Sequence, residues 1–345
     1  MRGRIPVTRR ARTGSVTVCT VAVLGLAILA AAVWFVFRPE PFPDRIRLGR
    51  GVDGGTWQAV GKSLTAVLEA ETPGLAVETA RTDGSVENVR RLESGELDLA
   101  FVQGDTPVHP SVRLIVPLYE NVLHLVVRAD ASPRIDEIHD LAGRSVAIGA
   151  EQSGTAEAAR VVLRHAGLTA DDLDERSLDT EASLVAFREG TVDAVFHFAA
   201  LPGEPVRRLL AARPAELLEL GACTPGSALD GLRAIHPGFE RAVIPTRVYG
   251  TEPANRIGTV SVQAVLACRE GLPDGFVRRV AEVAFGERIA LAQSHPALAR
   301  LSERFDPATI PIPLHPGADD YYHRKDPPFY VRYADPMSLA FTILL

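Results

Sequence analysis

The sequence is poor in cysteine and contains none of the short motifs that mark common catalytic sites. Only three cysteines occur in 345 residues, and two of them, Cys223 and Cys268, lie beyond the N-terminal apolar run. A disulfide framework is therefore excluded, and one bridge is the most that can form there. No GxSxG, HExxH or CxxC pattern is present, and the nine histidines are scattered singly. We therefore expect a protein that is not an enzyme and that carries no cofactor.

Charge is absent from one long stretch near the N-terminus. The 23 residues from Ser15 to Phe37 are uncharged, and as a helix they are long enough to cross a bilayer of roughly 30 Å. Residues 1–14 are rich in arginine, so we expect a basic cytoplasmic N-terminus, a transmembrane anchor over 15–37 and an extracytoplasmic remainder at the cell membrane. A cleaved signal peptide is the alternative, because small residues at Ala30 to Ala32 offer a cleavage site.

Basic residues are outnumbered in the part that follows the apolar run. Six of the 37 basic residues and none of the 43 acidic residues lie up to Arg38, so the remainder has a formal balance of −12. Such a balance argues against a nucleic-acid partner. About 305 residues remain outside the membrane, enough for two domains of ordinary size.

Short β-rich runs alternate with amphipathic helical patterns along this remainder. The first set predicts strands at 45–49, 75–81 and 97–103 and helices at 56–71 and 85–95, with Ser85 as N-cap of the second helix. The second set predicts strands at 145–149, 175–178 and 192–198 and helices at 154–167 and 181–190. This alternation predicts α/β architecture, with parallel strands covered by helices on both faces.

The two sets match each other in sequence. "LESGELDLAFVQ" aligns with "AFREGTVDAVFHF" at an offset of 95, and the Gly55-Thr56 pair aligns with Gly154-Thr155 at an offset of 99. A repeat of this length is too long for a solenoid unit. It predicts two similar three-layer α/β lobes.

A glycine motif opens the first helix. Gly49, Gly51 and Gly54 have the GxGxxG spacing of a dinucleotide-binding turn, with Glu78 or Asp83 as a possible ribose ligand. The second set repeats only the Gly-Thr pair, so the shared feature is a helix N-terminus that can bind an anion. The alternative is that these pairs only start helices.

Two acidic groupings suggest other sites. His315, Asp319, Asp320 and His323 cluster near the C-terminus and could form a metal site, although we favour a packing role and expect no metal. Asp98 and Asp193 each follow a glycine turn, and we expect them to bind backbone amides there.

Several segments resemble the TAXI family of extracytoplasmic solute receptors associated with TRAP transporters. They are "GVDGGTWQAVG", "TDGSVENVRRLESGELDLAFVQGD", "YENVLHLVVRAD", "DLAGRSVAIGAEQSGTAEAARVVLRHAGL", "FREGTVDAVFHFAALPGEPVRRL" and "PLHPGADDYY", in order from about Arg45 to Tyr322. The resemblance implies a type II periplasmic-binding-protein fold, with two lobes that close on a small glutamate-like or dicarboxylate solute. A TRAP permease would then import the solute.

The layout of the chain is consistent with this topology. Strands at 121–130 and 258–270 would cross between the lobes, and a helical stretch at 274–301 would return to the first. We therefore assign 45–128 and 257–330 to lobe I and 129–256 to lobe II, and leave 331–345 as an apolar tail whose role stays open.

The resemblance also implies ligand contacts, carried over residue by residue. Those in lobe I are Gly55, Thr56, Trp57, Ser85, Asn88 and Gln103, and those in lobe II are Ser153, Gly154, Thr155 and Phe198. For Ser85 and Asn88, helix capping alone is the alternative. Three residues depart from the family, Gln58 in the first lobe and His197 and Phe198 in the second, and they are expected to alter the pocket. A sensor of the same fold, with no transport, is the alternative function.

Overall fold

One mixed sheet of ten strands runs through the folded part of the chain. The computed structural model describes residues 23–31, 34, 41–305 and 310–326. The strand order is β2-β1-β3-β10-β4-β7-β5-β6, with β9 beside β10 and β8 beside β4. Pairing is parallel between β1 and its neighbours β2 and β3, and between β5 and its neighbours β6 and β7. The strands β10 and β4 lie between these parallel groups and pair antiparallel.

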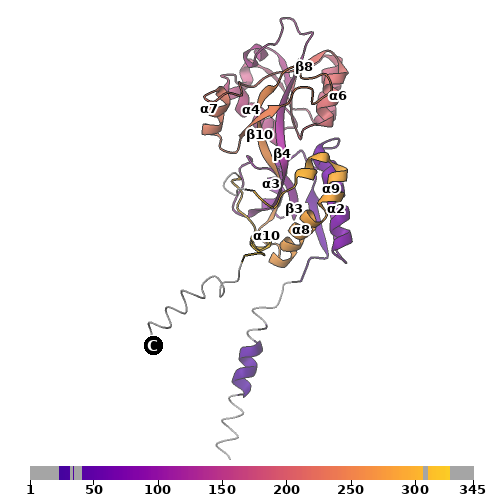
Figure 1. The fold of residues 1–345 in the computed structure, drawn as a ribbon, viewed down its shortest axis with the longest axis vertical. Helices are drawn as coiled ribbons and strands as arrows, with labels where there is room; N and C mark the ends of the chain where they lie inside the picture. Colours follow the sequence, from indigo (N-terminus) through magenta and orange to yellow (C-terminus); the bar gives the residue numbers. More distant parts are fainter. Residues whose placement is uncertain (1–22, 32–33, 35–40, 306–309, 327–345) are drawn as a thin grey trace, which may run out of the picture. The chain divides into compact units, whose positions relative to one another are not determined.

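We call the part built on the first parallel group lobe I (Figure 1). Its elements are β1 (Arg45–Gly49), α2 (Thr56–Glu71), β2 (Ala76–Ala80), α3 (Ser85–Glu93) and β3 (Leu99–Gln103), followed late in the sequence by α8 (Asp274–Gly286), α9 (Arg288–Ser294), the 3₁₀ turn η3 (Pro296–Arg300) and α10 (Pro316–Tyr322). One core cluster joins α2, α8, α9 and α10 to the sheet, and another joins α3 to its opposite face. Lobe I is therefore three layers deep.

Lobe II repeats the arrangement with different additions. Its elements are η1 (Ile138–Leu141), β5 (Ser145–Ala147), α4 (Gly154–His165), η2 (Ala170–Asp172), β6 (Asp174–Arg176), α5 (Thr180–Glu189), β7 (Ala194–Ala199), α6 (Glu204–Ala212), β8 (Ala215–Leu217), α7 (Ala228–Ile235) and β9 (Glu240–Ile244). The helices α4 and α7 cover one face of the sheet, and α5 and α6 cover the other. Along β7, Phe196 and Phe198 enter the first of these cores and Val195 enters the second, as strand alternation requires.

Two long strands connect the lobes. β4 (Val112–Arg128) and β10 (Ile257–Arg269) pair with each other in the middle of the sheet. β10 also pairs with β3 of lobe I and β9 of lobe II, and β4 also pairs with β7 and β8 of lobe II. Figure 1 shows both passing from one lobe to the other. Their register shifts between Ala264 and Val265 and again between Leu266 and Ala267. Such irregularities bend a strand pair locally.

Several sequence-based expectations need correction. The first crossing strand begins at Val112, nine residues earlier than predicted, and the helical stretch 274–301 is divided into α8, α9 and η3. The sequence left one bridge open, and in the structure Cys223 and Cys268 are free. Ser85 is the first residue of α3, whose N-cap is Gly84.

The grouping around His315 is also explained by packing. His315 is buried, and its ring bonds the backbone of Glu270 and Gly317, while His323 bonds its own helix. No cluster of potential metal ligands occurs among the described residues.

The predicted anchor falls mainly outside the described residues. Of the run 15–37, only 23–31 and 34 are described, and these are helical. Within the described part of the chain, no helix combines the length and the apolar character that a membrane span requires. The basic segment 1–14 and the tail 331–345 lie outside the described residues.

Candidate functional site

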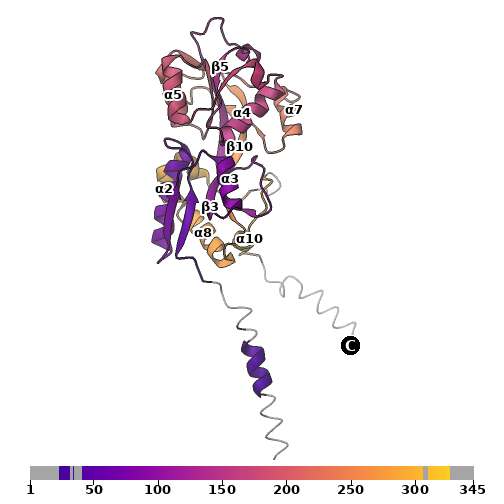
Figure 2. The same cartoon turned by 180° about the vertical axis from the view of Figure 1, so that it is seen from behind.

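Four helices begin around one pocket between the lobes. The helices α2 and α3 follow β1 and β2 in lobe I, and α4 and α5 follow β5 and β6 in lobe II. Residues from all four starts line the pocket, which holds about 670 Å³ of space partly open to solvent. Figure 2 shows these helices on both sides of the boundary between the lobes. The pocket thus lies at the carboxyl ends of the parallel strands, where open α/β sheets bind ligands.

The glycine motif shapes the start of α2. Gly51 and Gly54 have φ angles of 74° and 76°, a left-handed conformation that glycine adopts without strain. Gly49 is the last residue of β1, and an added Cβ there would lie 2.5 Å from Asn88 Oδ1. All three glycines therefore have local backbone or packing roles. In addition, antiparallel β10 follows β3 in the sheet, whereas a dinucleotide-binding fold continues with parallel strands.

Three of the predicted lobe I residues line the pocket from the start of α2. Gly55 is the N-cap, without a side-chain bond to the helix, and Thr56 and Trp57 follow it. The Trp57 ring is stacked on Phe101, with centroids 6.0 Å apart. Gln58 does not line the pocket but bonds Gly54 N and Asp53. It therefore supports the glycine loop and does not contact the pocket space.

The other predicted residues of lobe I have different positions. Ser85 lines the pocket, but its hydroxyl is occupied by Gln103 N and Thr106. Gln103 also lines the pocket, and its buried Oε1 has no hydrogen-bond partner among the described residues. Asn88 is fully buried behind the pocket, is not part of its lining, and donates from Nδ2 to Phe101 O. We therefore assign Asn88 a structural position between α3 and β3.

All four predicted residues of lobe II line the pocket. Ser153 caps α4, because its Oγ accepts a hydrogen bond from Ala156 N and donates one to Ala150 O. Gly154 and Thr155 follow in the first turn, and Phe198 contributes from β7. The sequence alignment paired Thr56 with Thr155. In the structure the first helical residue is Thr56 in α2 and Gly154 in α4, so Thr56 corresponds to Gly154.

The lobes contact each other beside the pocket. Glu87 N, in the first turn of α3, donates a hydrogen bond to Gln152 O before α4. An added Cβ on Gly154 would lie only 1.9 Å from Gln103 Oε1. An added Cβ on Gly84 would lie 3.1 Å from Ser153. Two glycines thus permit the close approach of the lobes.

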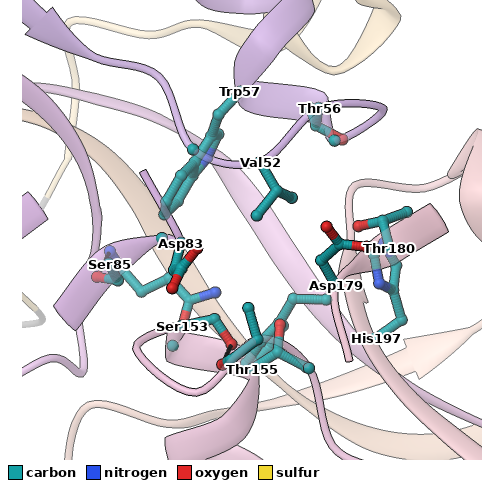
Figure 3. A pocket seen from close by; sticks show the side chains of 18 of the residues that line it. Val52, Thr56, Trp57, Asp83, Ser85, Ser153, Thr155, Asp179, Thr180 and His197 are labelled. Carbon is teal, nitrogen blue, oxygen red and sulfur yellow. Dashed lines mark hydrogen bonds between the residues drawn. The ribbon is translucent and has the colours of Figure 1, made fainter. Parts of the chain in front are cut away.

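Acidic side chains flank the pocket, and among the described residues that line it there is no lysine or arginine. Asp83 comes from lobe I and Asp179 from lobe II, on opposite sides of the pocket in Figure 3. Asp179 also caps α5 by accepting from Ala182 N. The Arg81 guanidinium lies between the two carboxylates, at 3.5 Å from Asp83 and 3.4 Å from Asp179. The helix N-termini are therefore the main groups of positive character in this lining.

Two histidines and a tyrosine lie beside one another at one side of the pocket, and of these His197 belongs to the lining. Burial lowers the pKa of His197, which lines the pocket, to about 4, so its ring is neutral at physiological pH. His124 lies opposite it on β4, and burial together with the charge of His197 lowers the pKa of His124 to about 3. His124 Nδ1 lies 2.9 Å from Val122 O and must donate to it, so Nε2 accepts from the Tyr249 hydroxyl at 2.8 Å.

Asp98 and Asp193 occupy equivalent places outside the pocket. Asp98 accepts from Arg47 N on β1, and Asp193 accepts from Ser145 N on β5. Burial favours the neutral form of Asp98, but bonds from Arg269 and Arg47 outweigh it and hold its pKa below the usual range. The carboxylates thus bind backbone amides, as expected, although the amides belong to neighbouring strands and not to the turns themselves.

A family comparison agrees with this architecture. A family model described as NMT1-like matches residues 48–325. The chain belongs to the NMT1-like family.

Solved structures are similar to this NMT1-like protein at low sequence identity. PhnD1 from Prochlorococcus marinus, in complex with methylphosphonate, is 12% identical, covers 82% of this chain and 98% of its own, and gives a TM-score of 0.51. The periplasmic aliphatic sulphonate binding protein SsuA from Escherichia coli is 15% identical over 74% and 77% of the two chains, with a TM-score of 0.43. The PhnD1 match shows an α/β periplasmic-binding-protein-like fold.

Sequence reasoning missed part of the lining of this NMT1-like protein. Tyr119 and Asn121 come from the crossing strand β4, and Asp83, Asp179 and Thr180 come from helix starts. The start of α5 could have been found from the repeat, because Thr180 follows Ser85 by the same offset of 95 residues that relates the flanking strands. Nothing in the sequence indicated that a side chain in the middle of β4 would reach the pocket.

Proposed function

We propose that this NMT1-like protein is a receptor for a small anionic solute that binds between the lobes. The observation that carries the proposal is the convergence of four helix N-termini on one pocket. The first backbone N–H groups of a helix have no partner within the helix and carry partial positive charge. Since the pocket lining includes no lysine or arginine, these groups are its main means of binding an anion.

The small size of the solute follows from the dimensions of the site. The pocket leaves a cavity of about 80 Å³ between the lobes, which suits a small ligand such as an amino acid or a dicarboxylate. Methylphosphonate, the ligand in the PhnD1 structure, is also a small anion. We propose that Gly55, Thr56, Trp57, Ser85 and Gln103 of lobe I and Ser153, Gly154, Thr155 and Phe198 of lobe II contribute to binding.

Thermal shift and calorimetry on the full chain in mild detergent test this proposal. The probes are glutamate, glutamine, 2-oxoglutarate, succinate, methylphosphonate and NAD. A bound solute at 100 times its dissociation constant should stabilise the protein by about 2.7 kcal/mol. Thr56→Val and Thr155→Val should weaken binding, because each removes a hydroxyl from a pocket-lining helix start. Thr65→Val, a change within α2 outside the lining, is the control.

Two results would contradict the proposed binding of a small anion between the lobes. Stabilisation by NAD alone would show that the glycine motif serves a dinucleotide and would reject the receptor proposal. Binding of a small anion that is insensitive to both pocket variants would place the site elsewhere.

We further propose that the receptor is anchored by residues 15–37, with its lobes outside the cytoplasm, and delivers its solute to a TRAP permease. The uncharged run with its arginine-rich flank and the TAXI-like motifs support this assignment. The division into lobe I (45–128 and 257–330) and lobe II (129–256) belongs to the same proposal. A tethered sensor with the same fold is the alternative, which a permanent anchor would also suit.

Localisation and uptake measurements separate these possibilities. The full chain should remain with membranes after a high-salt wash and be digested by protease added from outside the inner membrane, whereas a cleaved product would be released. Solute uptake that requires both this chain and a TRAP permease supports transport. Solute binding without any effect of the chain on uptake supports sensing.

A further inference from the structure

One arginine joins the two lobes beside the pocket. Arg81 follows β2 of lobe I, and its guanidinium lies 3.4 Å from the Asp179 carboxylate at the start of α5 in lobe II. The same guanidinium lies 3.5 Å from Asp83 and 3.6 Å from Asp53, both in lobe I. Asp53 precedes α2, Asp83 precedes α3 and Asp179 precedes α5. Arg81 therefore connects the loops before three of the four helices that begin around the pocket.

A second contact joins the loop before α2 to the first turn of α5. An added Cβ on Gly54 would lie 2.6 Å from Oε1 of Glu181, the second residue of α5. The Glu181 carboxylate is itself fixed by a bidentate ion pair with Arg208 on α6. The glycine loop of lobe I therefore packs directly against a carboxylate that lobe II holds in place. Both contacts join protein atoms alone, so they can hold the lobes together with or without a solute.

Asp179 serves two partners through its two carboxylate oxygens. Its Oδ1 accepts a hydrogen bond from Ala182 N and caps α5, whereas its Oδ2 faces the Arg81 guanidinium. Asp83 and Asp179 line the pocket from lobe I and lobe II (Figure 3). Two carboxylates on opposite lobes repel each other, and Arg81 replaces this repulsion by attraction to both. The charge of Arg81 therefore decides whether this side of the pocket favours contact or separation of the lobes.

The exposure of this ion pair makes it reversible and sensitive to salt. The side chain of Arg81 is 45% exposed and that of Asp179 is 34% exposed. Ion pairs of this kind contribute little to stability and are screened by salt. A pair of this strength holds the lobes in contact without making their separation slow.

We propose that Arg81 is a latch: its ion pair with Asp179 keeps the lobes in contact, and the pair has to break before a solute enters or leaves the pocket. Arg81 does this without belonging to the pocket lining. Its role in solute entry rests on the proposed receptor function, whereas its role in holding the lobes together does not. Because salt screens the pair, solute entry becomes faster as ionic strength rises.

Hydrogen exchange at one backbone amide tests the latch in the full chain in mild detergent, with no solute added. Glu87 N lies in the first turn of α3, where amides have no partner within the helix, and it donates to Gln152 O of lobe II at 3.2 Å. Its exchange therefore reports separation of the lobes. Arg81→Gln and Asp179→Asn should each accelerate this exchange about threefold at low salt, and asparagine still caps α5. Raising NaCl from about 0.02 M to about 0.5 M should accelerate it in the parent and have little effect in either variant.

An ion pair within one lobe provides the matched control. Arg45 and Glu78, both in lobe I, form an exposed pair at 2.8 Å. Arg45→Gln and Glu78→Gln therefore make the same changes in net charge without altering a contact between the lobes, and neither should change the exchange of Glu87. The latch requires acceleration in both Arg81→Gln and Asp179→Asn. Any other result, or equal acceleration in the control variants, overturns it.

Stopped-flow fluorescence of Trp57, which lines the pocket, tests the role of the latch in solute entry with the probes named for the receptor proposal. Arg81→Gln and Asp179→Asn should both raise the association and dissociation rates about threefold, although they change the charge beside the pocket in opposite directions. Unchanged association rates, or changes of opposite sign, would overturn this role. If no probe binds, the receptor proposal and the role in entry both fail, while exchange at Glu87 still decides whether Arg81 holds the lobes together.

Discussion

The two lobes share a scaffold but differ at the helix that each directs toward the pocket. In both, an aspartate after a glycine turn accepts a hydrogen bond from the first parallel strand, Asp98 in lobe I and Asp193 in lobe II. The helices that follow those strands differ, because α4 is capped by the Ser153 side chain, whereas α2 follows Gly55, an N-cap that makes no side-chain hydrogen bond. The comparison shows that the lobes share a fold but differ at the helix starts that line the pocket.

The largest expected effect concerns the two aspartates. The Asp98 side chain is 8% exposed and bonds two arginines as well as a backbone amide, whereas that of Asp193 is 20% exposed and contacts one arginine. Asp98→Ala should lower the free energy of unfolding by about 2 kcal/mol, because the Arg47 amide loses its acceptor and two partly exposed arginines lose charge-assisted hydrogen bonds. Asp193→Ala should cost roughly half as much. Chemical denaturation of both variants measures the difference, and equal losses would contradict it.

The lowered pKa of Asp98 predicts that the stability of the protein depends on pH in the acid range. Its pKa is lowered in the folded state, so its stabilising contribution is present above the unfolded pKa and is lost as pH falls through the folded value. The difference between the parent and Asp98→Ala should therefore shrink in strong acid.

The next effect concerns the glycines at the two helix starts. Gly154→Ala would place a Cβ 1.9 Å from the buried Gln103 Oε1, whereas Gly55→Ala would place one 3.3 Å from Val52 O. Overpacking of this kind typically costs about 1–3 kcal/mol. Since the clash lies between the lobes, Gly154→Ala should weaken solute binding roughly tenfold to a hundredfold and Gly55→Ala only slightly. Calorimetry compares the two, and similar affinities would argue against contact of the lobes in the bound state.

A smaller effect is expected from the caps. Ser153→Ala should destabilise the protein by about 1 kcal/mol, because Ala156 N loses its acceptor. The reciprocal change, Gly55→Ser, should add at most a few tenths of a kcal/mol. It should also weaken anion binding, because a serine oxygen would occupy a free amide of α2. Thermal unfolding with and without solute measures both effects, and a stronger affinity in Gly55→Ser would show that the missing cap has no role.

The smallest expected effect is a difference between the lobes in how stability changes with pH. Burial raises the pKa of Asp105, in lobe I, to about 7 and lowers that of His197, in lobe II, to about 4. Asp105 therefore reduces stability as pH rises from about 4 to 7, and His197 reduces it as pH falls from about 6.5 to 4. Asp105→Asn should raise the melting temperature at pH 8 by about 2–4 °C, if roughly 1 kcal/mol is recovered. It should raise it less at pH 5.

The matched change in lobe II should act at the opposite end of the pH range. His197→Gln should raise the melting temperature at pH 5 and leave it unchanged at pH 8. A melting temperature of either variant that follows the parent at every pH would contradict the assignment.

The sequence was informative where local pattern determines structure. The helix α2 was predicted with its observed bounds, because a glycine loop and an apolar stripe at helical spacing mark both its start and its buried face. The pocket residues at 55–57 and 153–155 followed from the resemblance and the repeat. In contrast, Asn88 resembles a polar residue facing a ligand, yet it is fully buried and bonds Phe101 O. Burial of a polar side chain depends on tertiary packing that a helical pattern does not encode.

Contacts between distant segments were likewise beyond the sequence. Tyr119 reaches the pocket only because β4 passes through the middle of the sheet, and Arg81 meets Asp179 only because two lobes come together. The contact between Arg81 and Asp179 joins residues about a hundred positions apart in the sequence, and the position of Tyr119 depends on the order of the strands in the sheet. The ion pair that Arg81 makes across the lobes therefore became visible only in the structure.

The paired crossing strands have a mechanical consequence. Because β4 and β10 continue without a break into the sheet of both lobes, relative movement of the lobes must bend this ribbon elastically, most easily at the irregular register near Val265. The stiffness of two short strand segments then sets how much binding free energy is stored as strain and returned when the solute leaves. Evolution could thus adjust residence time at this position while the chemistry of the pocket stays the same.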